Sequence, residues 1–377
     1  MRIGIDGIPL ASARTGIGHY TFELAQALAR LAPEHEFQLV SPVPFISGPP
    51  EPDGVAPSNL HKVQTKRRFW WGLGLPGYIT QSSLSLFHGT NYEVPLWSKC
   101  PSIVTVHDLS LLLHPEMHSS HLVRRARYRL PLMARAANTI IAVTESASKE
   151  ISDHLRINPA KIAVTPLAPR RTFRPLPPKQ TEETRKRLGV EDDFILFVGT
   201  PEPRKNLITL LRALTEVRRN TELRPQLVIA GKRGWHLNEI LAEIASAGLT
   251  ERLKFTDYIS DGDLCALYSS CTVCIYPSLY EGFGLPPLEA MACGAPVITS
   301  NIPSIVETTG NAAHLISPND VQQLAQAIVE MIAEAGKRLR LSRAGLERAS
   351  QFTWERTAEL TLEVYKETLR SWHRPIQ

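Results

Sequence analysis

The chain has 377 residues, 43% of them hydrophobic and 21% charged, which is the balance of a globular protein with room for two or three domains. A net charge of only +5, without any nucleic-acid-binding motif, argues against a nucleic-acid-binding protein. Five cysteines, an odd number, argue against a disulfide framework. No apolar run reaches the roughly 18 residues of a membrane-spanning helix, and the opening residues read as a strand rather than a secretion signal. We therefore expect a cytoplasmic protein.

Apolar runs alternate with amphipathic segments in the first half of the chain. Strands are expected at residues 2–6, 37–40, 84–88, 103–106, 139–143 and 162–165. Helices are expected at residues 19–31, 120–137 and 146–155. This βαβ alternation predicts an α/β fold with a doubly wound parallel sheet.

The alternation stops at residues 166–178, which contain five prolines and are interpreted as a linker. Strands are then expected at residues 194–198, 226–230, 253–256, 272–276, 296–299 and 314–316. Helices are expected at residues 207–218, 237–247, 261–269, 288–293, 320–334 and 354–372. The pattern predicts two Rossmann-like domains, residues 1–172 and 173–353.

The most informative stretch, residues 276–298, reads as a strand, a glycine-rich turn, a helix and a short strand. Gly282 and Gly284 let the backbone turn tightly and approach a ligand. Pro286 and Pro287 suit the first turn of a helix, where a missing N–H costs little. The result is a helix N-terminus reached through a glycine-rich loop, which is a natural binding site for an anion such as phosphate.

Two carboxylates, Glu281 and Glu289, flank this anion site with seven residues between them. Because a carboxylate beside a phosphate would repel it, we expect both side chains to accept hydrogen bonds from hydroxyl groups instead. A ligand that carries both phosphates and hydroxyls is a nucleotide, and a nucleotide sugar fits better still. The alternative is a structural helix start whose acidic residues complement the helix dipole.

The run E-G-F-G-L-P-P-L-E-A-M-A-C-G-A-P-V, residues 281–297, resembles the E-x7-E signature of retaining glycosyltransferases of family 4. The resemblance implies a GT-B fold, in which two Rossmann-like domains face a central cleft, the first (1–172) taking the acceptor and the second (173–353) binding the nucleotide sugar. It also implies that the C-terminal helix, here 354–372, packs back on the first domain. It implies transfer of a hexosyl group from UDP-glucose, UDP-galactose or GDP-mannose to a saccharide or lipid-linked saccharide acceptor in polysaccharide biosynthesis. It also implies reaction on one face of the sugar without a metal or other cofactor, although double displacement through a covalent intermediate stays open.

Two segments of the first domain resemble parts of the family that face the donor. T-G-I-G at residues 15–18 resembles a family loop, which implies that Gly16 and Gly18 approach the donor, although the third glycine of the dinucleotide fingerprint is absent. His107 follows a strand, and its V-H-D-L context resembles a family segment whose histidine contacts the donor sugar. His88, also at a strand end, is a weaker candidate.

The segment G-T-P-E-P-R-K-N, residues 199–206, resembles the diphosphate clamp of the family. This implies that Arg204 offers a bidentate fork to phosphate oxygens and that Lys205 offers a point charge. Many family members carry an arginine directly after the glycine at the strand end, where this chain has Thr200, so it stays open which cation meets which phosphate. The expected catalytic residues are His107, Arg204, Lys205 and Glu281.

Further residues are expected at the nucleotide pocket because of their position in the family. Gly231 follows one strand, and Tyr258 and Ile259 follow the next, with the backbone near Ile259 placed to contact a base edge. Glu289 is expected to bind the ribose hydroxyls. Backbone contacts leave the choice between UDP and GDP open. The expected donor-binding residues are Gly16, Gly18, Gly199, Gly231, Tyr258, Ile259, Gly282, Phe283, Gly284, Leu285 and Glu289.

Two basic and aromatic segments, residues 62–71 and 118–135, suit a membrane surface or a lipid-diphosphate acceptor, and the alternative is an ordinary solvated surface. No Asp-x-Asp motif or histidine cluster in the sequence predicts a metal site.

Two rival functions are a nucleotide-sugar epimerase of similar fold and a non-catalytic nucleotide-sugar-binding protein. The second rival should lack His107, Lys205 or Glu281, and this chain keeps all three.

Overall fold

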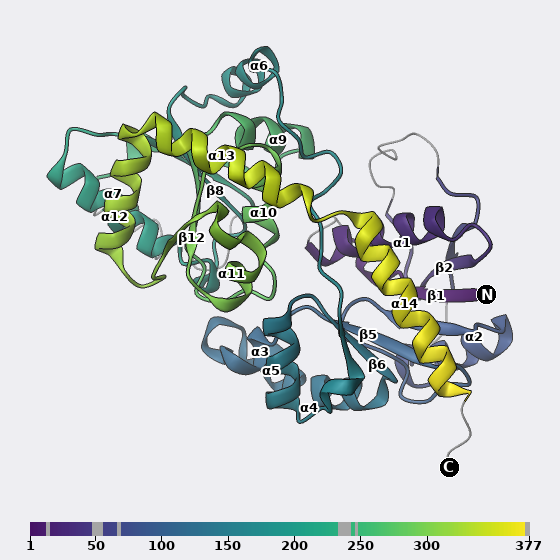
Figure 1. Cartoon of the computed structure of the whole chain (residues 1–377). Coiled ribbons are helices and arrows are strands. Elements are labelled where there is room, and N and C mark those ends of the chain that lie inside the picture. Colours follow the sequence, from purple (N-terminus) through teal and green to yellow (C-terminus); the bar gives the residue numbers. More distant parts are fainter. Residues whose placement is uncertain (13–15, 47–55, 66–68, 233–242, 246–247, 374–377) are drawn as a thin grey trace. The chain divides into compact units, whose positions relative to one another are not determined.

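The computed structural model describes residues 1–12, 16–46, 56–65, 69–232, 243–245 and 248–373. The chain divides into two compact units, one made of Met1–Ala168 with Phe352–Gln377 and the other of Pro169–Gln351 (Figure 1). Most of the helix expected at 237–247 lies outside the described residues, and so does Thr15 of the T-G-I-G segment.

The strands described in the first unit form one parallel sheet in the order β3-β2-β1-β4-β5-β6-β7. They are β1 (Arg2–Asp6), β2 (Glu36–Ser41), β3 (Leu60–Gln64), β4 (Leu86–Gly89), β5 (Ser102–Val106), β6 (Thr139–Ala142) and β7 (Ile162–Val164). Every residue of β4 and β5 is buried, as in a parallel sheet covered on both faces, whereas β3 lies at an edge and is partly exposed.

The first unit includes the C-terminal helix of the chain. Its helices are α1 (Gly16–Leu31), α2 (Leu75–Ser82), α3 (Ser110–Leu113), α4 (Ser120–Ala136), α5 (Glu145–Leu155) and α14 (Trp354–Trp372). Helix α14 packs along α1, where the rings of Tyr20 and Trp354 lie 6.2 Å apart. Its Thr368 hydroxyl lies 2.7 Å from the hydroxyl of Thr139 on β6. Both polar and apolar contacts therefore tie α14 to this sheet and to α1.

His88 connects the sheet to α14 rather than facing a ligand. Its Nδ1 lies 2.7 Å from the Tyr365 hydroxyl, and its Nε2 lies 2.7 Å from Oγ1 of Thr105. The ring is fully buried, and this burial lowers the pKa of His88 to about 3. A neutral imidazole with both nitrogens engaged is a structural bridge, so the weaker functional reading of His88 is not supported.

The second unit contains its own parallel sheet in the order β10-β9-β8-β11-β12-β13. The strands are β8 (Phe194–Val198), β9 (Gln226–Ala230), β10 (Leu253–Asp257), β11 (Val273–Tyr276), β12 (Val297–Ser300) and β13 (His314–Ile316). The described helices are α6 (Pro178–Leu188), α7 (Leu207–Asn220), α9 (Asp261–Ser270), α10 (Leu285–Ala292), α11 (Pro303–Thr309), α12 (Val321–Ala333) and α13 (Ala335–Ser350). Apolar side chains from β8, β9, α7 and α12 form one continuous core.

The boundary between the units lies at Ala168–Pro169, four residues before the expected boundary at 172–173. The reason is that Arg170, inside the stretch interpreted as a linker, forms ion pairs with Glu289 and Asp261 of the second unit. The five cysteines are buried free thiols.

Each sheet reverses its strand order once. In the first sheet the reversal falls between the neighbouring strands β1 and β4, and in the second it falls between β8 and β11. Open α/β sheets bind ligands outside the carboxyl ends of their strands at such a reversal, because the two connections leave in opposite directions there. The fold therefore singles out one candidate site in each unit.

Candidate active site

Two loops meet at the strand-order reversal of the second sheet. One follows β8 and carries Arg204 and Lys205, and the other follows β11 and carries Glu281. The N–H of Leu279 donates to the carbonyl of Arg204 at 2.9 Å, and the side-chain amide of Asn206 donates to the carbonyl of Pro277 at 3.0 Å. These bonds hold the basic loop against the acidic loop.

Glu281 is the centre of a compact charged cluster. Its Oε2 accepts a hydrogen bond from Arg204 Nη1 at 2.8 Å, and its Oε1 accepts one from Lys205 Nζ at 2.7 Å. The Tyr276 hydroxyl also donates to Oε1, at 2.9 Å. Arg204 pairs in addition with Glu202 at 2.9 Å. Three of the four expected catalytic residues, Arg204, Lys205 and Glu281, are thus in direct contact.

The charge state of the cluster follows from its burial and its pairing. Burial favours a neutral Glu281, but the charges of Arg204 and Lys205 outweigh it and lower the pKa of Glu281 to about 2. Burial, assisted by the neighbouring charge of Arg204, lowers the pKa of Lys205. The carboxylate is therefore ionised at neutral pH, and two cations lie beside it at the carboxyl end of the sheet.

The start of α10 is fixed directly beside this cluster. Gly284 caps the helix at φ +96°, and a Cβ there would lie 2.3 Å from Cδ1 of Ile305, so the position requires glycine. From α11, the Ser304 hydroxyl donates to the carbonyl of Glu281 at 2.5 Å, and the Thr308 hydroxyl donates to the carbonyl of Phe283 at 2.6 Å. The positive end of the α10 dipole therefore adds to the two cations.

Glu289 lies on α10 and is engaged by an arginine that the sequence analysis did not single out. Arg170 binds it in bidentate fashion, Nε to Oε1 at 2.8 Å and Nη2 to Oε2 at 3.0 Å. Arg170 also binds Asp261 at 2.6 Å and stacks over the ring of Phe173 at 4.1 Å. No local pattern marks Arg170, because its two carboxylate partners are far away in the sequence.

The other donor-binding candidates of the second unit follow the ends of neighbouring strands. Gly199 and Gly231 follow β8 and β9, and a Cβ on Gly231 would lie 2.4 Å from the carbonyl oxygen of Gly199. Tyr258 follows β10, is 59% exposed and has Lys232 Nζ 5.7 Å from its ring centroid. Ile259 comes next in the chain. Gly282 and Leu285 belong to the loop and the first turn of α10 described above.

The fourth expected catalytic residue, His107, follows β5 in the first unit. Its Nε2 donates to the carbonyl of Thr90 at 2.9 Å, and the Tyr20 ring meets it edge-on at 4.8 Å. Burial lowers the pKa of His107, so the imidazole is neutral and its Nδ1 is the hydrogen-bond acceptor. Gly16 and Gly18 form the first turn of α1 in the same unit.

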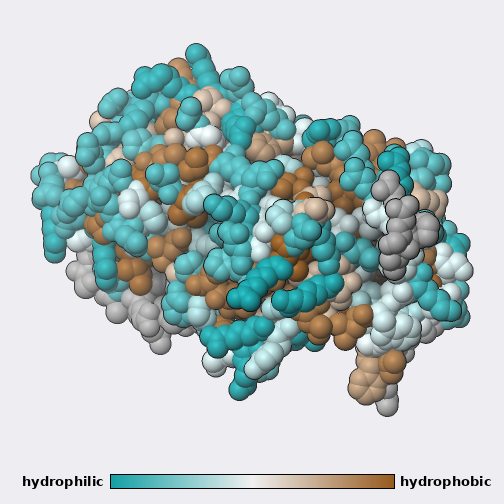
Figure 2. All heavy atoms as spheres, turned by 60° about the horizontal axis from the view of Figure 1, so that its bottom comes forward, coloured by the Kyte–Doolittle hydropathy of each residue, from teal (hydrophilic) through white to brown (hydrophobic). Residues whose placement is uncertain are grey.

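Within the described ranges, no group of three His, Cys, Asp or Glu is arranged as metal ligands, and metal independence stays a prediction. Among the same residues, none of the helices is long and apolar enough to cross a membrane. Hydrophobic and hydrophilic residues are interspersed over the face of the molecule that Figure 2 shows.

Comparison with known proteins identifies the family. A family model described as "Glycosyltransferase Family 4" matches residues 14–168, and one described as "Glycosyl transferases group 1" matches residues 179–348. O-antigen chain mannosyltransferase B of Escherichia coli is 30% identical over 388 residues, which cover 97% of this chain and all of the relative. The chain belongs to the family 4, group 1 glycosyltransferases.

Other relatives and solved structures agree with this assignment. The glycosyltransferase is 31% identical over 275 residues to serotype-specific mannosyltransferase WbdA of Escherichia coli, across 72% of this chain and 34% of that longer protein. Sucrose-phosphate synthase from Thermosynechococcus elongatus superposes with a TM-score of 0.76 at 21% identity, over 98% of this chain and 100% of that one. Anabaena HepE in complex with UDP and glucose superposes with a TM-score of 0.74 at 20% identity, over 97% and 99%. These structures and the two parallel-sheet units show the GT-B fold.

Proposed function

We propose that this glycosyltransferase is a retaining hexosyltransferase whose nucleoside-diphosphate sugar is bound mainly by the second unit. The observation that carries the proposal is the convergence of Arg204 and Lys205 on Glu281, beside the N-terminus of α10 and at the strand-order reversal. Cations and a helix N-terminus together suit a diphosphate, and the carboxylate suits sugar hydroxyls.

The cluster suggests how the reaction is assisted. When the bond between sugar and phosphate breaks, negative charge grows on the leaving diphosphate. Arg204 and Lys205 already lie in a buried, preorganised site and stabilise that charge without having to be desolvated in the same step. In this proposal the diphosphate draws both cations toward itself, while Glu281 accepts hydrogen bonds from the sugar.

Neutral His107 fits the same proposal because a ring whose Nε2 donates to a carbonyl can accept a sugar hydroxyl at Nδ1 without adding charge. The acceptor hydroxyl then attacks on the face from which the diphosphate leaves, and a phosphate oxygen takes its proton. This route yields retention and requires no protein nucleophile.

The relatives suggest which donor to test first. Two of them are named as mannosyltransferases, one in O-antigen synthesis, and the HepE structure is titled as a complex with UDP and glucose. We therefore place GDP-mannose first and UDP-glucose and UDP-galactose after it, with a saccharide or lipid-linked saccharide as acceptor.

The test is a donor screen that measures release of GDP or UDP in the presence of saccharide acceptors. One donor should be consumed in an acceptor-dependent way, and NMR of the product should show the anomeric configuration of the donor. A product of inverted configuration would refute the retaining mechanism. Donor epimerised without transfer, or bound without turnover, would support one of the two rivals.

We further propose a cytoplasmic enzyme in peripheral contact with a membrane. Helix α4 exposes Leu122, Tyr128 and Leu132 together with Arg124 and Arg127, which suits an anionic lipid surface. Residues 66–68 of the other basic segment lie outside the described residues. Sedimentation with vesicles that contain anionic lipid, compared with neutral vesicles, tests this contact, and equal sedimentation with both would contradict it.

A further inference from the structure

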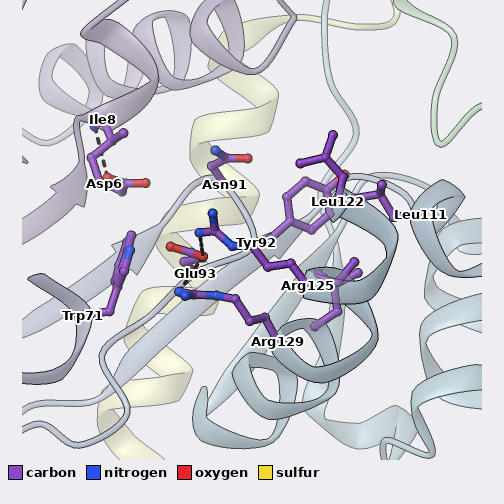
Figure 3. A pocket seen from close by; sticks show the side chains of 12 residues that line it. Asp6, Ile8, Trp71, Asn91, Tyr92, Glu93, Leu111, Leu122, Arg125 and Arg129 are labelled. Atoms are coloured by element: carbon purple, nitrogen blue, oxygen red, sulfur yellow. Dashed lines mark hydrogen bonds and ion pairs between the residues drawn. The ribbon is translucent and has the colours of Figure 1, made fainter. Parts of the chain in front are cut away.

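The strand-order reversal of the first sheet also carries a cavity, which the sequence analysis did not predict. It has a volume of about 350 Å³, within the range of small-molecule sites. Its walls come from the end of β1, the segment after β4, the π-helical turn Trp70–Gly74 and helices α3 and α4 (Figure 3). Among the described residues, all that line the cavity belong to the first unit.

Tyr92 connects this cavity to the expected sugar-contacting residue. It lines the cavity, its ring lies 5.7 Å from that of His107, and its hydroxyl accepts a hydrogen bond from the N–H of Asp108 at 3.1 Å. His107 itself does not line the cavity. The cavity therefore adjoins the residue that the proposed function assigns to a sugar hydroxyl, without including it.

Among the described residues that line the cavity, the charged side chains nearly balance each other. The side chain of Glu93 is 17% exposed and forms ion pairs with Arg125 Nη2 at 3.1 Å and with Arg129 Nη2 at 2.6 Å (Figure 3). The fourth charged group is Asp6, and burial raises its pKa to about 7. A phosphate entering here would have to displace Glu93 from both arginines and would meet a second carboxyl group.

The remaining lining suits a sugar ring. The carboxyl group of Asp6 and the amide of Asn91 both border the cavity, and Asp6 Oδ1 accepts a hydrogen bond from the N–H of Ile8 at 3.0 Å (Figure 3). Such groups match sugar hydroxyls, which donate and accept hydrogen bonds. The indole of Trp71 supplies a flat apolar wall, against which the C–H face of a pyranose can stack.

We propose that this cavity binds an uncharged pyranose residue of the acceptor, stacked on Trp71 and hydrogen-bonded by Asp6 and Asn91, and that the Glu93 bridge to Arg125 and Arg129 excludes phosphorylated sugars. The acceptor role rests on the proposed function. The saccharide site itself is inferred from the lining of the cavity alone.

Direct binding to the full-length chain tests the site. The probes are the methyl α-glycosides of mannose, glucose and galactose, and the corresponding hexose 6-phosphates, followed by saturation-transfer NMR. At least one neutral glycoside should bind the wild type, and Trp71→Ala and Asn91→Ala should weaken that binding by about tenfold or more. The matched control is Trp97→Ala, since Trp97 is a 54% exposed tryptophan of the same unit that does not line the cavity.

Glu93→Gln tests the charge argument separately. Without the carboxylate, both arginines can turn to a phosphate, so a hexose 6-phosphate should bind this variant about tenfold more tightly than the wild type, while neutral glycosides keep their affinity. Circular dichroism identifies folded variants. The proposal is overturned if no neutral glycoside binds, if Trp71→Ala and Trp97→Ala bind equally well, or if the wild type prefers the phosphates.

Nucleotide binding separates this proposal from the proposed function. Calorimetry with GDP and UDP should give unchanged affinities for Trp71→Ala and Asn91→Ala. If the wild type turned over no nucleotide sugar, the proposed function would fail, whereas the saccharide site would still be decided by the NMR result alone.

Discussion

Glu281 accepts hydrogen bonds from two cations and a phenol, so removing any one of these groups alters the others. In the proposed function Arg204 and Lys205 stabilise the growing charge of the leaving diphosphate, so Lys205→Ala and Glu281→Gln should each lower kcat by about 10²–10³-fold, with much smaller changes in donor KM. Steady-state kinetics on folded variants measures this. Lys186→Ala removes an exposed lysine paired with Glu182 and should leave kcat unchanged. Unchanged kcat in both site variants would instead favour a binding protein.

Arg170 is the residue through which the structure adds most to the site that the sequence predicted. It holds Glu289 in a bidentate pair, and lysine cannot reproduce that fork. We expect Arg170→Lys to raise the donor KM more than it lowers kcat, because the carboxylate that we assign to the ribose loses its orientation. Arg187→Lys, at an exposed pair with Asp263, is the matched control. Equal donor KM values for the two variants would refute a positioning role.

The sequence predicted Glu289 but not its partner, for a physical reason. A motif describes neighbours along one loop and one helix, whereas Arg170 and Glu289 are 119 residues apart and meet only through the folded second unit. The same holds for Tyr276, whose hydroxyl bonds Glu281 although its position reads simply as buried strand. The motif singled out Glu281 and Glu289, whose roles stay predictions, whereas the contacts that orient them exist only in the folded unit.

Asp6 makes the stability of the first unit depend on pH. Burial raises its pKa from 3.8 to about 7, so between these values the folded state binds more protons than the unfolded state. Its contribution is therefore fully present below pH 4 and is lost as the pH rises through 7, at about 1.4 kcal/mol per pH unit. Thermal unfolding from pH 5 to pH 8 should show Asp6→Asn gaining stability relative to the wild type. A constant difference between the two proteins would contradict the raised pKa.

At the scale of elements, the glycines at the starts of loops and helices differ in whether a larger residue can replace them. A Cβ on Gly231 would clash with the backbone of Gly199 and strain a φ of +155°, whereas a Cβ on Gly16 meets nothing within 4 Å. Gly16→Ala should therefore keep the melting temperature, since alanine favours a helix, and should raise the donor KM if the backbone there approaches the donor. Gly231→Ala should lower both stability and kcat. Wild-type kinetics of Gly16→Ala would show that the start of α1 does not contribute to the donor site.

Elements with strong apolar periodicity were the predictable ones. The expected strand at 2–6 and helix at 354–372 coincide with β1, which is almost wholly buried, and α14, whose buried residues recur at helical spacing. The sequence analysis missed β3, a partly exposed edge strand, and α6, a strongly charged surface helix. It also missed α13, where Gly345 lets the helix pack closely against Met291. The secondary structure of such elements is determined by contacts with neighbouring elements more than by the apolar periodicity of their own sequence.

At the scale of the molecule, each unit has a core of its own. The second unit is built around one apolar cluster from its sheet, α7 and α12. Helix α14 follows it in sequence but buries Trp354 and Tyr365 against the first unit. The described boundaries therefore predict where the chain can be cut, namely before Pro169 and after Gln351.

We expect the fragment of residues 169–351 to fold and to bind the nucleotide of the donor, since Arg204, Lys205, Glu281 and Glu289 all lie within it. A fragment that begins at residue 179 lacks Arg170 and leaves Glu289 buried without its bidentate partner, so it should bind more weakly or be less stable. Calorimetry with GDP and UDP on both fragments, together with thermal unfolding, measures the difference. A folded 169–351 fragment without nucleotide affinity would show that the donor site needs the first unit, and equal behaviour of the two fragments would show that Arg170 does not support the site.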